Sequence, residues 1–180
     1  MDIHQNYFEF LGLPLSYTVD QTELTRRYRE LQRELHPDRY AHLSEREQRM
    51  AVQYTAYLNE AYSSLKSPLG RAQYLLSLQG VDTLSESRVQ LDPMFLMEQM
   101  ELREALEEAQ EASDPEEALE ELEGQAQATV TSLADEFALL WPALQSSEEA
   151  DFTEAEKLVR KLQFAVKFHK EIERLLNELD

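Results

Sequence analysis

The sequence predicts an all-α protein built from two helical modules. Only 4 glycines and 6 prolines occur in 180 residues, and this scarcity of turn-forming residues favours long helices. Apolar residues recur at spacings of three and four along most of the chain, which is the period of amphipathic helices. Charge divides the chain, because residues 1–76 are nearly neutral whereas residues 77–180 carry almost all of the net charge of −19.

The first module is predicted to be a helical hairpin with a short helix before it. The short helix ends at Gly12, a residue type common at helix C-termini. Asp20 and Glu23 form a capping-box pattern at the start of the second helix, and Ser44 and Glu47 form another at the start of the third. Each long helix carries one apolar stripe, so we expect the two to pack antiparallel.

The second module is predicted to be an antiparallel bundle of three helices. Asp92 and Asp114 are each followed by proline, which marks the start of the first two helices. Pro142 is expected to end the second of them. The third begins near Thr153, and its apolar residues alternate in spacings of four and three, as in a bundle seam. The predicted seam consists of Leu158, Leu162, Ala165, His169, Ile172, Leu176 and Leu179.

These elements define the expected domains and compartment. Residues 1–78 form the first module with a short connecting helix, 79–91 form a linker, and 92–180 form the bundle. The absence of cysteine excludes a disulfide framework and a thiolate metal site. No secretory signal or apolar run long enough to span a bilayer is evident, and the acidic surface disfavours nucleic acid and anionic membranes. We therefore expect a cytoplasmic protein with no metal.

A loop between the second and third helices contains His36-Pro37-Asp38. Pro37 disfavours helical geometry at the residue before it, so the second helix must end at this point. The tripeptide follows one amphipathic helix and precedes another, and this context separates it from a chance match. We interpret it as a functional motif rather than a polar turn.

Arginines line the helix before this loop. Arg26, Arg29 and Arg33 are three and four residues apart, so their side chains share one face. Arg27 and Arg39 lie nearby. In so acidic a chain, a basic stripe indicates a docking face for an acidic partner. A solvated face paired with neighbouring glutamates is the alternative that the sequence leaves open.

The helix that begins after Asp92 has apolar residues on two opposite sides. The side that can face the bundle consists of Phe95, Leu102, Leu106 and Ala109. Leu96, Met97 and Met100 lie on roughly the opposite side, and such a surplus apolar patch is typical of a protein-binding surface. Packing of this patch on the first module is the alternative. Phe164 and Phe168 either extend the patch or fill the bundle.

Together these features resemble the HscB family of J-domain co-chaperones. Residues 1–76 look like a J domain, and the segments 71–76, 95–104 and 160–164 are similar to HscB sequences. The resemblance implies stimulation of the ATPase of a DnaK-type chaperone, HscA, and delivery to it of the iron–sulfur scaffold protein IscU. The implied chaperone-binding residues are His36, Pro37, Asp38, Arg26, Arg27, Arg29, Arg33 and Arg39. The implied scaffold-binding residues are Leu96, Met97, Met100, Glu101, Glu104, Glu108 and Phe164.

Three other functions compete with this interpretation. An enzyme is disfavoured, because the four histidines show no metal-ligand spacing with carboxylates and no phosphate loop or nucleophile arrangement is present. A J protein that serves a different client would share the first module but not the second surface. In a purely structural helical adaptor, the tripeptide would serve only as a turn between helices. We expect a protein with no catalytic residue and no cofactor, because the chemistry belongs to the partner.

Overall fold

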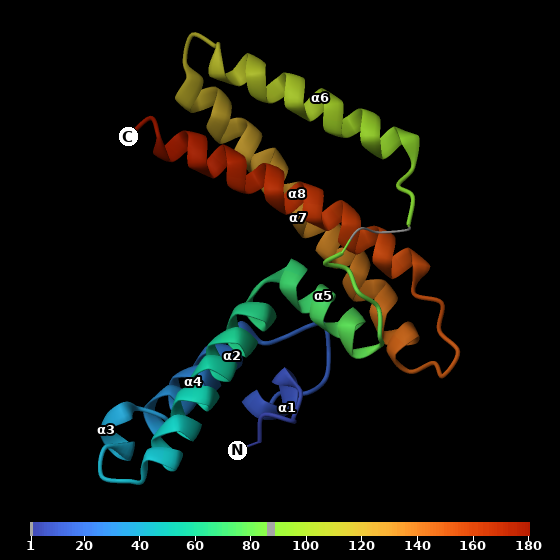
Figure 1. Cartoon of the computed structure of the whole chain (residues 1–180). Coiled ribbons are helices and arrows are strands. Elements are labelled where there is room, and N and C mark those ends of the chain that lie inside the picture. The colour runs from blue at the N-terminus through green and yellow to red at the C-terminus, as the bar shows by residue number, and fades with distance from the viewer. Residues whose placement is uncertain (1, 86–88) are drawn as a thin grey trace. The chain divides into compact units, whose positions relative to one another are not determined.

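The computed structural model describes residues 2–85 and 89–180, and every regular element in those ranges is a helix (Figure 1). The all-α prediction is confirmed. The chain divides into two compact units, Met1–Leu75 and Leu76–Asp180, which are described separately. Residues 86–88 of the predicted linker lie outside the described residues. Within the described ranges, no helix has both the length and the apolar character needed to cross a membrane.

The first unit is a helical hairpin with a short helix packed against it. Its helices are α1 (Tyr7–Leu11), α2 (Gln21–Glu34), α3 (Pro37–Tyr40), α4 (Glu45–Lys66) and α5 (Pro68–Leu78), the last of which crosses the division between the units. Helices α2 and α4 contact each other, and α1 contacts both. Fully buried side chains from all three form the core, among them Leu11, Leu24 and Leu58. The predicted hairpin therefore forms through its apolar stripes.

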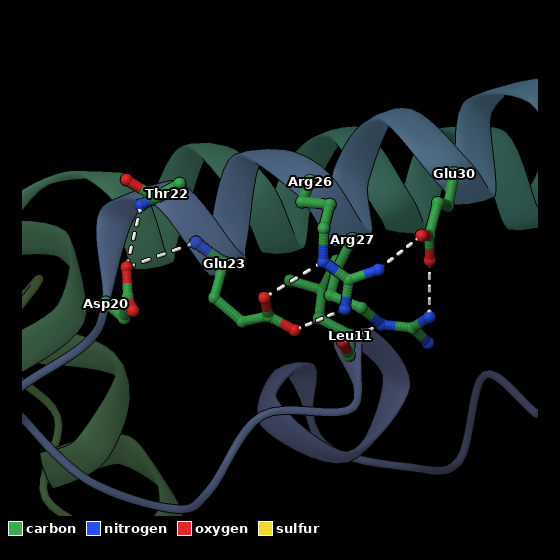
Figure 2. Close-up of polar contacts among 7 residues, drawn as sticks. All are labelled: Leu11, Asp20, Thr22, Glu23, Arg26, Arg27 and Glu30. Carbon is green, nitrogen blue, oxygen red and sulfur yellow. Dashed lines mark hydrogen bonds and ion pairs between the residues drawn. The ribbon is translucent and has the colours of Figure 1, made fainter.

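The helix starts predicted from capping residues are present, with one difference. Ser44 and Glu47 form a complete capping box, and the bond from the Ser44 backbone lowers the pKa of the Glu47 carboxyl. Asp20 caps α2 by accepting backbone N–H bonds from Thr22 and Glu23 (Figure 2). The Glu23 carboxylate, however, accepts bonds from the Arg26 guanidinium. The Glu23 carboxylate was expected to accept a bond from the Asp20 backbone N–H, but it pairs instead with the charged Arg26 one turn later in α2.

A group of aromatic rings ties α1, α4 and α5 together. Tyr7 stacks on Tyr74 with ring centroids 4.0 Å apart, and its edge meets Tyr57 at 5.2 Å. The Tyr7 backbone N–H also donates a 2.9 Å hydrogen bond to the Tyr74 hydroxyl. Burial raises the pKa of Tyr57 to about 12, so this phenol stays neutral at physiological pH. The rings therefore act as one packed, uncharged cluster.

The junction between α4 and α5 requires glycine at position 70. A Cβ atom on Gly70 would lie 2.8 Å from the backbone oxygen of Ser64, which cannot move without distorting α4. We predict that Gly70→Ala lowers the free energy of unfolding by about 1–3 kcal/mol, the usual cost of overpacking. Gly124 in α7 is the matched control, because nothing lies within 4 Å of the corresponding Cβ. Gly124→Ala should stabilise the protein by about 1 kcal/mol through helix propensity. Denaturant unfolding measures both, and equal stability of the two variants would contradict this account.

The second unit contains three long helices. These are α6 (Pro93–Gln110), α7 (Pro115–Gln145) and α8 (Thr153–Asn177). Asp92 and Asp114 cap α6 and α7 as predicted. Helix α7 packs along both α6 and α8 (Figure 1). One core cluster draws on all three helices and consists of Leu106, Ala109, Leu119, Leu122, Ala126, Phe168 and Ile172. The predicted three-helix arrangement is therefore present.

The expected end of α7 at Pro142 is wrong, because the helix continues to Gln145. Proline removes one helical N–H bond and its ring crowds the carbonyl four residues earlier, so a helix needs other contacts to continue past it. Trp141 supplies such contacts within α7, since its ring stacks on Phe137 at 5.3 Å and its Nε1–H donates a 2.7 Å bond to Gln145. Trp141 also packs on Phe152 beyond the helix at 5.8 Å, and together these contacts outweigh the helix-breaking signal of Pro142.

The buried stripe of α8 is also rotated from the predicted seam. Leu162, Ala165 and Ile172 are buried as expected, but Leu179 lies beyond the helix and is exposed. The stripe that the structure buries consists of Ala155, Val159, Leu162, Ala165, Phe168 and Ile172. Phe168 therefore fills the bundle, which settles one of the two alternatives for that residue.

Candidate functional site

The His36-Pro37-Asp38 motif forms the start of a helical turn. The loop predicted around it contains the short helix α3, with His36 as its N-cap and Pro37 in its first turn. Proline suits this position because its missing N–H has no helical partner to lose. The His36 Nδ1 accepts a 3.2 Å bond from the Asp38 backbone N–H. This bond fixes the ring relative to the turn while leaving the imidazole and the Asp38 carboxylate largely exposed.

A large groove runs beside this motif. Its volume is about 1790 Å³, and it lies between α2, α3 and the first half of α4. The side chains that line it are Gln21, Thr22, Thr25, Arg26, Arg29, Gln32, Arg33, Leu35, His36, Pro37, Tyr40, Ala41, Gln48, Ala51, Val52, Thr55, Ala56 and Asn59. We call this set the basic groove, because three arginines supply its charge above an apolar floor. Its size suits a protein segment rather than a small metabolite.

The arginines of α2 differ in how they are held. Arg26 pairs with Glu23 and Glu30, and these partners raise the pKa of its guanidinium (Figure 2). Arg29 and Arg33 are exposed and form no ion pair with any described residue. The alternative of a solvated face partly paired with glutamates therefore describes Arg26 within the stripe of Arg26, Arg29 and Arg33. Arg29 and Arg33 present unneutralised charge along the groove.

Arg27 occupies a different position from the other arginines. Its Nε donates a 2.9 Å bond to the Leu11 carbonyl, and its Nη1 lies 2.8 Å from Glu30 (Figure 2). These contacts connect α1 to α2. Arg27, Asp38 and Arg39 belong to the predicted site but are absent from the lining of the basic groove among the described residues.

Helix α4 forms one wall of the basic groove, although none of its residues was predicted to belong to this site. Val52 is 70% exposed and lines the groove together with Ala56 and Asn59. Val52 interrupts a solvent-facing stretch outside the buried stripe of α4, which includes Ala51 and Leu58. An exposed β-branched residue beside the buried stripe was the signal that could have found this wall.

The second predicted surface lies on α6. Leu96, Met97 and Met100 are 46%, 62% and 67% exposed, whereas Phe95 on the opposite side is buried. The carboxylates predicted to accompany them are exposed as well. We call this the α6 face, and it consists of Leu96, Met97, Met100, Glu101, Glu104, Glu108 and Phe164. It combines an exposed apolar centre with an acidic margin.

Phe164 joins the α6 face from the neighbouring helix. Its ring meets Phe95 edge-on at 5.8 Å, yet 44% of Phe164 remains exposed. The ammonium group of Lys161 lies 5.4 Å from the Phe95 ring and 3.4 Å from the Asp92 carboxylate. The pKa of the Asp92 carboxyl is lowered mainly by the hydrogen bond from the Phe95 backbone N–H and further by Lys161. These contacts hold the start of α6 against α8. Phe164 therefore packs only partly against the bundle, and its membership in the patch with Leu96, Met97 and Met100 stays a prediction.

The stretch before α6 is also held on α8. Thr83 is buried, and its carbonyl accepts a 2.8 Å bond from Gln163. The Ser85 carbonyl accepts a 2.8 Å bond from Arg160. The described part of the predicted linker is therefore attached to the second unit through side chains adjacent to Phe164.

One group of side chains has the composition of a metal site. His169 lies between Glu123 and Glu173, with Nε2 2.7 Å from Glu123 and Nδ1 3.7 Å from Glu173. The Nε2 contact joins α8 to Glu123 of α7, and Glu173 lies one turn after His169 on α8 itself. These polar contacts connect α7 and α8.

Comparison with known proteins decides the family. The family model described as "DnaJ domain" matches residues 6–74, and the model described as "HSCB C-terminal oligomerisation domain" matches residues 91–173. A relative from Shewanella loihica, the "Co-chaperone protein HscB homolog", is 46% identical over 94% of this chain and 96% of its own length. The chain belongs to the HscB family. Membership makes it a J-domain co-chaperone of iron–sulfur cluster assembly.

Solved HscB structures share this fold. The structure "Chaperone HscB from Vibrio cholerae" matches with a TM-score of 0.83 and 40% identity, covering 98% of this chain and 100% of that one. The human co-chaperone HscB matches with a TM-score of 0.83 and 28% identity, covering 96% of this chain and 83% of the human chain. The two-part architecture described above is thus the HscB architecture.

Proposed function

We propose that this HscB-family chain stimulates the ATPase of the DnaK-type chaperone HscA and delivers the scaffold protein IscU to it. The basic groove would contact the chaperone, and the α6 face would carry the scaffold. Residues 1–78 then form the chaperone-binding module and residues 92–180 the client-binding bundle, with 79–91 as their connection. The observation that carries the proposal is the presence of two exposed surfaces of different chemistry, one on each unit of the chain.

The chemistry of the basic groove supports the chaperone half. Arg29 and Arg33 have no ion pair within the described chain, so an acidic partner surface would satisfy them. His36 and Pro37 lie at one end of the same groove, which allows one partner to touch the charge and the motif together. We infer that ATP hydrolysis occurs in the partner and that this chain supplies only contacts.

The chemistry of the α6 face supports the client half. Methionine side chains adapt their shape to a partner, and the exposed glutamates around them favour a partner with basic residues at its margin. The identification of the client as IscU follows from the HscB resemblance. The proposed place of action is the cytoplasm, as expected from the sequence.

The proposal is tested by measuring steady-state ATP hydrolysis by HscA with the chain and IscU added separately and together. We expect the chain to raise the rate, and the chain with IscU to raise it further, because the client is brought to the chaperone. Calorimetry should detect binding of IscU to the chain alone. Absence of any rate increase would refute the chaperone half, and absence of IscU binding would refute the client half.

Arg29 and Arg27 form a matched pair that separates docking from folding. We predict that Arg29→Ala raises the concentration needed for half-maximal stimulation of HscA by about three- to tenfold and weakens its salt dependence, because an exposed charge guides association. Its unfolding midpoint should not change. Arg27→Ala should instead lower the free energy of unfolding by about 1–2 kcal/mol, since the Leu11 carbonyl loses a charged donor. The reverse pattern in denaturant unfolding and ATPase titrations would contradict these assignments.

A further inference from the structure

Three of the five methionines of the chain are exposed on one helix. Met94, Met97 and Met100 of α6 are 72%, 62% and 67% exposed, whereas Met50 of α4 is 39% exposed. Their spacing of three residues keeps them within about 120° around the helix axis. Among the methionines that the structure describes, the thioethers that solvent reaches most readily are therefore gathered within and beside the α6 face.

An exposed thioether reacts with hydrogen peroxide. The sulfur attacks one peroxide oxygen, the O–O bond breaks and an S=O bond forms, so that R–S–CH₃ and H₂O₂ give R–S(O)–CH₃ and H₂O. Sulfur loses two electrons and peroxide gains them. The product is polar where the thioether was apolar, and methionine sulfoxide reductases reverse the change with electrons from thiols.

The surroundings of these sulfurs determine what oxidation would do. Glu101 and Glu104 are exposed on the same side of α6 as Met97. An ionised carboxylate only accepts hydrogen bonds, and so does a sulfoxide oxygen, so these neighbours cannot satisfy the new polar group. Burial of that group against an apolar partner would leave it without a donor.

The fold itself would be spared by oxidation of this face. The core on the other side of α6 uses Phe95, Leu106 and Ala109, which contain no sulfur. The methionines are exposed, so oxygen on their sulfurs displaces no packed neighbour. The effect would fall on what binds the surface rather than on stability.

We propose that Met94, Met97 and Met100 form a reversible oxidation site through which peroxide switches off client binding. The modification stands on the exposure and grouping of these sulfurs, and its consequence rests on the proposed binding of IscU at the α6 face. The oxidised chain would keep its basic groove and lose its client.

The experiment treats the full-length chain with graded hydrogen peroxide, maps sulfoxides by peptide mass spectrometry and measures IscU binding by calorimetry. Circular dichroism checks that the helices persist. Met94→Leu/Met97→Leu/Met100→Leu removes the reactive sulfurs at similar volume, and Met50→Leu is the matched control. Each variant is compared with its own untreated sample, so that any direct effect of leucine on affinity cancels.

We expect the α6 methionines to oxidise before Met50 and the affinity of the treated wild-type chain to fall about tenfold or more, equivalent to about 1.4 kcal/mol. The triple leucine variant should change less than about twofold on treatment, Met50→Leu should lose as much as wild type, and sulfoxide reductases should restore the loss. Earlier oxidation of Met50, unchanged affinity after α6 oxidation, or equal peroxide sensitivity of the triple variant would each overturn the proposal. If the untreated chain fails to bind IscU, the proposed function fails instead, and the order of oxidation still decides whether the site exists.

Discussion

Replacement of His36 by glutamine should abolish stimulation of HscA, with about nine-tenths or more of the rate increase lost. His36 caps α3 with its Nδ1, and its exposed ring stands at one end of the basic groove. Helix α3 is only one short turn and the His36 ring is exposed, so loss of this cap bond should leave the long helices folded while the imidazole contact with the chaperone disappears. Steady-state ATP hydrolysis by HscA measures the loss, and circular dichroism and thermal unfolding report on the fold.

His42 provides the control for this substitution. It lies in the same connection between α2 and α4, is exposed, and takes no part in the lining of the groove described here. His42→Gln should stimulate HscA as well as the unmodified chain. Full activity of His36→Gln would leave the motif as a structural turn and support the helical-adaptor alternative, whereas unfolding of that variant would show that the ring is needed for the turn.

Removal of the apolar centre of the α6 face should weaken IscU binding by about 100-fold. Leu96→Ala/Met97→Ala/Met100→Ala truncates three exposed side chains that are not among the buried residues of α6. Truncation of a central interface residue typically costs about 1 kcal/mol or more, and three such losses correspond to about two orders of magnitude in affinity. Calorimetry with purified IscU measures the change. Stimulation of HscA in the absence of scaffold should persist, because the basic groove is untouched.

Leu139 tests whether any exposed apolar residue would give the same result. It is 85% exposed on α7 and is not a member of the α6 face. Leu139→Ala should therefore bind IscU with unchanged affinity. If the triple variant binds as tightly as Leu139→Ala, the client surface lies elsewhere and a J protein with a different client becomes the better interpretation.

Local signals predicted the fold where a residue acts through its immediate neighbours. Asp20, Ser44, Asp92 and Asp114 each cap the helix that they were expected to open, because an N-cap bond spans only three residues. Prediction failed where side-chain packing decided the outcome. Helix α7 continues past Pro142, where Trp141 stacks on Phe137 and packs on Phe152 beyond the helix. Spacing within α8 alone could not reveal which of its faces is buried.

The residues of the candidate sites could also be predicted where their exposure depends on position along one helix, and not where it depends on packing between helices. The exposure of Leu96, Met97 and Met100 could be predicted from their positions around the α6 axis. They lie opposite the side that packs in the bundle, and one helix at the edge of a bundle buries only one side. Arg27 shares a helix with Arg26 and Arg29, and only the position of the Leu11 carbonyl separates its role from theirs. An exposed Val52 beside the buried stripe was the only local sign of the groove wall on α4, because the groove itself depends on how α4 packs against α2.

The distribution of aromatic residues makes the two units optically distinguishable in the intact chain. All 8 tyrosines lie at or before Tyr74, and several of them form the cluster around Tyr7. The single tryptophan, Trp141, is 1% exposed and stacks on Phe137 in the second unit. Fluorescence excited at the long-wavelength edge of the absorption band comes from the indole alone and would therefore report unfolding of the bundle. Near-ultraviolet absorbance of the tyrosines would report unfolding of the J domain. A bound chaperone or scaffold would thus reveal, without any label, which half of the molecule it stabilises.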